Sequence, residues 1–455
     1  MAEKCGLRTA SIIGSPFLSL AKVVSKGMGA PHLRIAEYPG VPMTDDASAL
    51  QNKVEQTVSP QIISALTRAT GKAEEPGAAQ DESAPAPRDI VATGSLDQIL
   101  DTFHANQWSD GLPIVPPTLE RVEAFLRFTD RRPDEVMGVL PVEGRAATPW
   151  TVAVNGVMAG CEPRYMPVLM AIVECIADPA FRLEDAGATP GWEPLVIISG
   201  PIIKELDINS GAGVMRVGRR ANTSIGRFLR LYMRNVGGFR ITPGDGDKAC
   251  IGSTFNVALA ENEEAVRQFG WPTFGSDRGF QPGQNVVTVQ SVVMASAPTY
   301  SAGTSALDHA SIHKDVICEA FKYWAFLGIK RTKWNALFVM SPAVAQVIAS
   351  QWSKDDYRKY LLDSVRMPVS QLMRFARNLS NTEFDIEQMV QAGALPPVYA
   401  ESSDPDRLVP IFLDASNISI IVAGDAGRNQ SRGYMNNHQQ GWPVSKAVVL
   451  PGNWR

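Results

Sequence analysis

The chain has 455 residues, of which 45% are hydrophobic and 20% are charged, and its net charge at pH 7 is −4. The length predicts two or three domains, and the weak negative charge, with no Lys/Arg-rich run, gives no reason to expect a nucleic-acid partner. No apolar run reaches the roughly 18 residues that favour a membrane span. The five cysteines are scattered and lack a CxxC pair, which favours reduced thiols and a cytoplasmic location.

Residues 1–70 predict a partial α/β unit. A strand at 8–14 is followed by a helix that Ser15 and Pro16 open, and then by a second strand at 33–38. The two strands should be parallel with a right-handed crossover. A further amphipathic helix is predicted at 48–70. Two strands are too few for a stable sheet, so either this sequence is part of a longer chain or a second polypeptide supplies the rest of this domain, and we expect the second polypeptide.

Residues 71–94 are rich in Ala, Pro, Glu and Gly, and they predict a flexible linker. Residues 95–455 predict a large α/β domain with a mixed sheet, because strand and helix patterns alternate. Its helices are predicted at 96–105, 118–126, 151–158, 165–176, 219–236, 307–326, 342–351, 354–363 and 368–377. Its strands are predicted at 194–198, 285–290, 291–295, 336–340, 417–422 and 447–451. The sequence shows no internal repeat.

Residues 199–264 concentrate glycine, asparagine and charged residues next to apolar runs. Backbone N–H groups of a Gly-rich turn and of a helix N-terminus, together with an arginine fork, can bind a carboxylate or phosphate. We therefore predict one wall of a pocket for a small polar or acidic substrate. Its predicted residues are Asn209, Ser210, Arg219, Arg220, Asn222 and Arg227. The alternative is a structural loop whose arginines pair with the acidic residues at 261–264.

A second wall is predicted where the apolar strand at 417–422 runs into the Gly-rich turn at 424–432. In open α/β sheets, ligands bind beyond the carboxyl ends of the strands. The predicted contacts are Arg428, Asn429 and Ser431. The turn lacks the GxGxxG pattern, so a dinucleotide is not favoured.

Glu263 and Cys161 are predicted catalytic groups. Glu263 lies between two other acids, and clustered like charges raise a carboxyl pKa towards the range of a general base. The alternative is that these acids mark a helix N-terminus. Cys161 falls in a turn between two predicted helices, where a helix N-terminus can lower the pKa of a nucleophilic thiol. The alternative is a small buried side chain.

His309 and His313 are one helical turn apart, which is the spacing of a metal-binding pair. They predict either a divalent metal site or, for His309, an acid/base catalyst near neutral pH. No third metal ligand can be named from the sequence.

Two resemblances cover nearly the whole chain. Residues 1–70 resemble the back half of the UGSC-type (seleno)protein domain, through Thr-Ala-Ser-Ile-Ile at 9–13, Gly-Ala-Pro at 29–31 and Leu-Arg-Ile at 33–35. Residues from 96 to about 450 resemble the larger domain often found with it in bacteria. The matching motifs lie at 110–118, 155–163, 200–201, 220–227 and 261–264. The family's Cys/Sec-Gly-Ser-Cys motif is absent, and Cys5 does not match it.

This resemblance implies a subunit of a thiol-dependent enzyme that acts on a small polar or acidic molecule by reductive cleavage or addition–elimination. The reacting thiol or selenol would come from a partner subunit carrying the missing half-domain, so we expect a hetero-oligomer. The sequence identifies no cofactor; the alternatives are none beyond the partner thiol, or a divalent metal at His309 and His313. One alternative is a hydrolase or lyase that uses Glu263 or His309. Another is a non-catalytic binding subunit of a redox complex.

Overall fold

The computed structural model describes residues 8–18, 21–22, 25, 33–67, 88–141, 143–185, 191–241, 252, 254–331, 335–380, 383–436 and 441–454. The chain is α/β, with 45% helix, 15% strand, and both parallel and antiparallel pairing, which confirms the predicted fold class. Most of the predicted linker, together with Cys5 and Cys250, lies outside the described residues.

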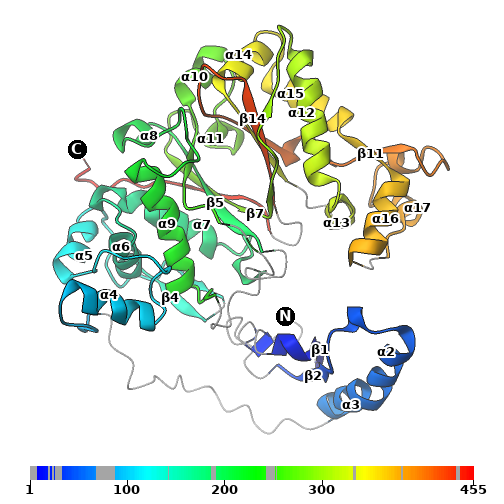
Figure 1. Ribbon diagram of the computed structural model, residues 1–455, viewed down its shortest axis with the longest axis horizontal. Coiled ribbons are helices and arrows are strands. Elements are labelled where there is room, and N and C mark those ends of the chain that lie inside the picture. Colours follow the sequence, from blue (N-terminus) through cyan, green and yellow to red (C-terminus); the bar gives the residue numbers. More distant parts are fainter. Residues whose placement is uncertain are drawn as a thin grey trace.

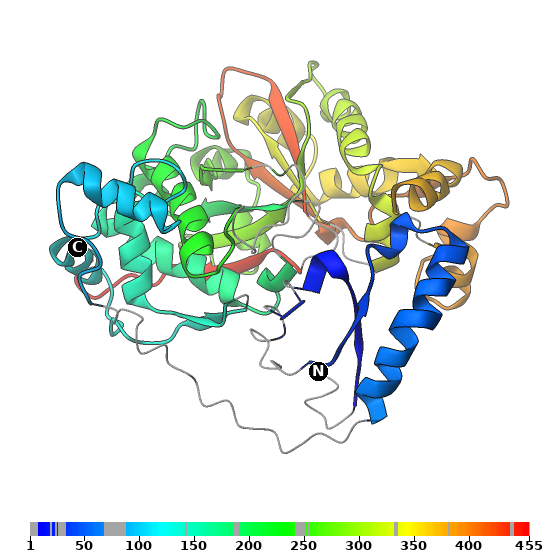
Figure 2. The ribbon, with the colours of Figure 1, turned by 60° about the horizontal axis from the view of Figure 1, so that its bottom comes forward.

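The N-terminal unit has two parallel strands, as predicted. β1 (Ser11–Gly14) pairs with β2 (Ile35–Tyr38), and α2 (Ala47–Lys53) and α3 (Ser59–Thr67) follow, joined by a π-helical turn at Val54–Val58. Figure 2 shows these elements in blue, with the helices running beside the strand pair. The buried cluster here consists of Ala36, Tyr38 and Val58, which is a small core for an α/β unit.

Two mixed sheets form the centre of the large domain. The first has the strand order β15–β7–β5–β6, made by Val444–Ala447, Val286–Val292, Glu193–Ser199 and Leu259–Ala260. The second has the order β13–β10–β14–β8, made by Ile418–Val422, Ala336–Met340, Gln430–Met435 and Met294–Ala295, and β9 (Thr299–Tyr300) also pairs with β14. In the first sheet the longest pairing joins the two central strands, β5 and β7, and in the second sheet β10 pairs along its whole length with both β13 and β14.

The sheets face each other, and helices cover their outer faces (Figure 1). Alternate residues of the strands decide this arrangement, because successive side chains point to opposite faces. Leu195 and Ile197 of β5 join Leu337 and Val339 of β10 in the cluster between the sheets. The neighbouring strand residues instead join the two helix-covered clusters.

The first sheet is covered by helices from the first half of the domain. They are α4 (Leu96–Ala105), α5 (Leu119–Leu126), α6 (Pro149–Met158), α7 (Met166–Ala177) and α9 (Arg220–Asn235). The second sheet is covered by α10 (Glu263–Phe269), α12 (Ala306–Phe321), α13 (Ala325–Arg331), α14 (Pro342–Ala349), α15 (Lys354–Ser364) and α16 (Val369–Ser380). Ser95 caps α4 in a reciprocal capping box, and Ser305 and Ser353 cap α12 and α15 in the same way.

Short elements complete the large domain. They are the β3–β4 hairpin (Gly138–Leu140 and Arg145–Ala147), the β11–β12 pair (Arg366–Pro368 and Leu408–Pro410), α8 (Ile202–Glu205), α11 (Phe274–Asp277) and α17 (Ile386–Gln391).

The two sheets repeat one topology. In each sheet a central strand, β5 or β10, is flanked by a later parallel strand, β6 or β13, and by an antiparallel strand, β7 or β14. The fourth strand is exchanged: β8, which follows β7, belongs to the second sheet, and β15, which follows β14, belongs to the first. The sequence gives no sign of this repeat, because the two halves share strand order rather than residue identity.

Several predicted elements differ from the structure. The strand boundary predicted between residues 290 and 291 lies instead at Val293, between β7 and β8. The closing strand spans Val444–Ala447 rather than 447–451, since Val444 is buried against β7 while Val449 is exposed. The predicted helix at 307–326 is interrupted after Phe321, where the chain makes a turn before α13 begins at Ala325.

Candidate functional site

The two predicted walls meet at the carboxyl ends of strands from both sheets. The N–H of Asn262, just after β6, donates to the carbonyl of Val422 at the end of β13 (2.8 Å). Two residues further on, the N–H of Gly424 donates to the carbonyl of Ser210 (2.9 Å). The loop at 209–213 and the turn at 424–430 are therefore neighbours. This junction is where an open α/β sheet presents its ligand-binding loops.

Glu261 is the most perturbed carboxyl group at this junction. It leaves β6 with its side chain only 1% exposed, and its Oε2 accepts a hydrogen bond from the N–H of Phe274 (2.7 Å). Its Oε1 has no hydrogen-bond partner in the described structure. Burial raises the pKa of Glu261 to about 7, with nearby Glu263 and Asp277 acting in the same direction and Lys354 opposing them. At neutral pH this carboxyl can therefore either accept or donate a proton.

Glu263, the predicted base, has a different environment. It is the first residue of α10, as the alternative interpretation expected, and its Oε1 accepts from the N–H of Gly200 (2.5 Å). Its Oε2 lies 3.4 Å from Arg267 Nη1. Burial raises the pKa of Glu263, while the bond from Gly200 lowers it. Both oxygens have partners, so Glu263 holds the turn after β5. The third acid of the cluster, Glu264, is exposed.

Asn222 and Asn209 tie the predicted substrate loop to the protein frame. The Asn222 side chain accepts from the N–H of Asn209 (2.8 Å) and donates to the carbonyls of Asn209 (2.9 Å) and Ala258 (3.0 Å). The Asn209 side chain in turn bonds within its own turn, to Gly211 and Ala212. Asn222 is buried, and these bonds place it as a structural clamp between α9 and β6.

The three predicted arginines each bind an acid outside the 261–264 cluster. Arg219 lies 3.2 Å from Asp207, and Arg220 lies 2.9 Å from Glu162. Arg227 makes a two-pronged pair with Asp110, with both N–O distances 2.8 Å. The predicted alternative, in which these arginines pair with residues 261–264, is therefore wrong. Arg227 instead fixes the loop at 110–113, and the carboxylate that it binds is that of Asp110 rather than that of a substrate.

The residues predicted for the second wall lie partly at the surface and partly in the interior of the protein. Arg428 and Asn429 are exposed, and the Asn429 carbonyl accepts from the N–H of Ser301 (3.3 Å). Ser431 is buried, and its hydroxyl lies 3.1 Å from His313 Nε2. The structure therefore keeps Arg428 and Asn429 available at the surface and places Ser431 in a separate polar network.

That network joins the two predicted histidines. His309 Nδ1 lies 2.7 Å from the Ser301 hydroxyl, and His313 Nδ1 lies 2.7 Å from the Tyr357 hydroxyl. Both imidazoles are fully buried, and burial lowers the pKa of His313 to about 3. His309 Nε2 has no hydrogen-bond partner in the described structure. The residues that the structure describes include no group of three His, Cys, Asp or Glu side chains that could hold a metal, so the metal site stays a prediction.

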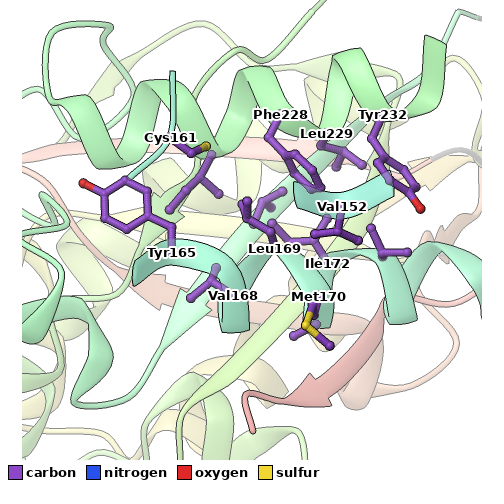
Figure 3. Packing of buried hydrophobic residues seen from close by; sticks show 14 of the residues in the cluster. Val152, Cys161, Tyr165, Val168, Leu169, Met170, Ile172, Phe228, Leu229 and Tyr232 are labelled. Carbon is purple, nitrogen blue, oxygen red and sulfur yellow. The ribbon is translucent and has the colours of Figure 1, made fainter. Parts of the chain in front are cut away.

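Cys161 lies in the predicted turn but lacks the predicted electrostatics. Its side chain belongs to an apolar cluster with Tyr165, Leu169 and Phe228 (Figure 3). Burial raises the pKa of Cys161 to about 12, so the prediction of a lowered thiol pKa is wrong. The reason is that the Sγ is desolvated by side chains from α6, α7 and α9, which outweighs the neighbouring arginines.

Sequence reasoning missed Lys354 and Asp277, which lie beside Glu261. Lys354 Nζ and Arg358 Nη2 each lie 2.6 Å from Asp277 Oδ2. A lysine at the first position of α15 opposes the helix dipole, and this local conflict was the one signal in the sequence. A separate open groove of about 340 Å³ lies on α7 and β15 and is lined by Glu174, Asp178 and Lys446.

None of the helices among the described residues is both long and apolar enough to cross a membrane. Comparisons of the chain with protein-family models, curated protein sequences and solved structures found no match.

Proposed function

We propose that the chain is an enzyme subunit in which Glu261 transfers a proton to or from a small polar or acidic molecule. The observation that carries this proposal is the Glu261 carboxyl itself: one oxygen is held by the N–H of Phe274, the other has no partner in the described structure, and the pKa is about 7. General acid–base catalysts need a pKa close to the working pH. The exposed Arg428 at the same strand ends is suited to hold an acidic substrate.

We further propose that the reacting thiol or selenol comes from a partner subunit. Burial raises the pKa of Cys161 and Cys175 to about 12 and also raises that of Cys318, so these thiols are poor nucleophiles. The described part of the N-terminal unit supports a partner, because it contains a two-stranded sheet in which Ile12 is 54% exposed, and Ile63 on α3 is 62% exposed. A chain that resembles the front half of a UGSC-type domain would add strands there and bring the Cys/Sec-Gly-Ser-Cys motif.

Two reaction classes fit such a thiol. In addition–elimination, the thiolate adds to the substrate while Glu261 gives up a proton, and Glu261 takes the proton back as the leaving group departs. In reductive cleavage, two partner thiols become a disulfide, and their two electrons and two protons go to the cleaved substrate bond. In both reaction classes the proposed substrate is a small polar or acidic molecule.

The test uses the complex co-expressed with a UGSC-type front half-domain. The complex is incubated with a panel of small amino and carboxylic acids and dithiothreitol, and substrate loss is followed by proton NMR. We expect E261Q to lower turnover by at least about 100-fold, because general acid–base catalysis contributes that much. E264Q is the matched control, since Glu264 is exposed in the same acidic cluster. Unchanged turnover in E261Q would refute the role of Glu261.

Alkylation tests the partner thiol separately. Iodoacetamide treatment of the assembled complex should abolish turnover. If this chain alone is treated and the untreated partner is then added, the resulting complex should still turn over substrate. If turnover survives alkylation of the complex, the thiol part of the proposal is wrong and a hydrolase or lyase remains.

A hydrolase is the second candidate, and one observation favours it. The Ser301 hydroxyl lies 2.7 Å from His309 Nδ1, a distance at which an imidazole can take the proton of a serine nucleophile. A fluorophosphonate probe should then label Ser301 in the wild type and not in H309A. Absence of label on the folded wild-type protein would remove this candidate.

A further inference from the structure

A buried cation lies beside Glu261 and contacts the same turn. Lys354 is 1% exposed, and its Nζ donates to the carbonyl of Pro272 (3.0 Å) and to Asp277 Oδ2 (2.6 Å). Pro272 and Asp277 flank Phe274, whose N–H holds the Glu261 carboxyl. Lys354 therefore fixes both ends of the short segment that positions Glu261.

Burying Lys354 at this position lowers the stability of the fold. A fully buried ammonium loses its hydration, and at the first residue of α15 it also meets the positive end of the helix dipole. Asp355 and Asp356, the next two residues, are the type that this helix end favours. Asp277 compensates part of the cost, but Asp277 is shared with Arg358, which lies 2.6 Å from the same oxygen. Arg358 also pairs with Asp355 (2.7 Å), so Lys354 is the cation of this group that acts on Glu261.

We propose that Lys354 is a positioning residue that holds the segment carrying Phe274 against Glu261 and favours the ionised form of the Glu261 carboxyl. This inference rests on the proposed role of Glu261 in proton transfer. Without Lys354, only the N–H of Phe274 would favour the carboxylate against burial and the neighbouring carboxylates. Glu261 would then hold its proton more tightly at neutral pH and give it up less readily.

The groups that face Glu261 come from three helices. Lys354 on α15 favours the carboxylate, whereas Glu263 on α10 and Asp277 on α11 oppose it. The N–H of Phe274 favours the carboxylate by donating to it. Burial is the largest influence and favours the neutral acid. Lys354 is the cation among these groups, so its removal should shift the protonation equilibrium of Glu261 towards the neutral acid.

The experiment measures the protonation of Glu261 directly, in the folded full chain. Infrared difference spectra of protein with ¹³C-labelled glutamate are recorded across pH, and the band lost in E261Q is assigned to this carboxyl. In K354M we expect the apparent pKa of Glu261 to rise by about one unit or more, the size typical of losing a close opposite charge. K359M is the matched control, because Lys359 lies on the same helix and its side chain is exposed.

The direction of the shift separates charge from damage. If K354M merely loosened the site, water would enter and the pKa of Glu261 would fall towards that of an exposed carboxyl. K354R, which keeps the charge, should restore the wild-type value, and K354Q, which keeps an N–H donor, should behave as K354M does and serves if K354M fails to fold. An unchanged or lowered pKa in the folded K354M or K354Q protein would overturn the inference. Because the readout is not turnover, this result is independent of the activity of E261Q, which tests the proposed function.

Discussion

The substitution E261Q should remove a pH dependence from the stability of the protein. Burial raises the pKa of Glu261 from 4.5 to about 7 in the folded chain. Below the lower value the carboxyl is protonated in both the folded and the unfolded chain, so its contribution to the unfolding free energy is fully present. As the pH rises, the unfolded chain ionises first, and the contribution is lost by about the pKa of the folded state. The loss is about 3 kcal/mol, since one pKa unit is worth about 1.4 kcal/mol.

Urea unfolding of wild type and E261Q, at several pH values between about 4.5 and 8, measures this loss. The quantity of interest is the difference between the two unfolding free energies, because titration of all other groups cancels in it. As the pH rises, the wild type should lose about 3 kcal/mol of unfolding free energy relative to E261Q. E264Q should show a flat difference. If the difference for E261Q is also independent of pH, the pKa of Glu261 is the same in the folded and unfolded chain, and the reasoning fails.

Three further predictions test the other residues of the site. Iodoacetamide should modify Cys161 at least about a hundred times more slowly in the folded chain than in the unfolded chain, because burial raises its pKa to about 12; mass spectrometry follows the modification. N222A should lower the unfolding free energy by about 2–4 kcal/mol, because it removes three hydrogen bonds from a buried clamp. Since the pKa of His313 falls from 6.5 to about 3 on folding, its contribution to stability is present above the unfolded value and is lost as the pH falls from there. The wild type should therefore lose stability relative to H313Q as the pH is lowered across this range.

Each of these three predictions has an outcome that contradicts it. Fast alkylation of Cys161 would mean that its surroundings are open to solvent. A change below about 0.5 kcal/mol in N222A, the size of a surface substitution, would mean that water replaces the clamp. A difference between H313Q and wild type that stays constant with pH would mean that His313 can take up a proton without leaving the core.

The predictions for individual elements succeeded where a local pattern was sufficient. The apolar run at 336–340 predicted the bounds of β10, and the helical pattern at 96–105 predicted those of α4. Such patterns depend on neighbours within a few residues, so the sequence contains all of the information. The pairing of the strands could not be predicted from the sequence. The strand after β7, which is β8, lies in the second sheet, and the strand after β14, which is β15, lies in the first. An apolar strand has the same sequence pattern whichever strand it pairs with.

The candidate site shows the same division. The sequence by itself placed acidic residues at 261–264 and polar loops at the ends of apolar strands, because these clusters are contiguous along the chain. Only the tertiary structure distinguished Glu261 from Glu263 and assigned the arginines to Asp110, Glu162 and Asp207. The perturbation of Glu261 depends on how deeply it is buried and on Lys354, which lies more than 90 residues away in the chain. Burial and long-range charge pairs are properties of packing, so no local pattern encodes them.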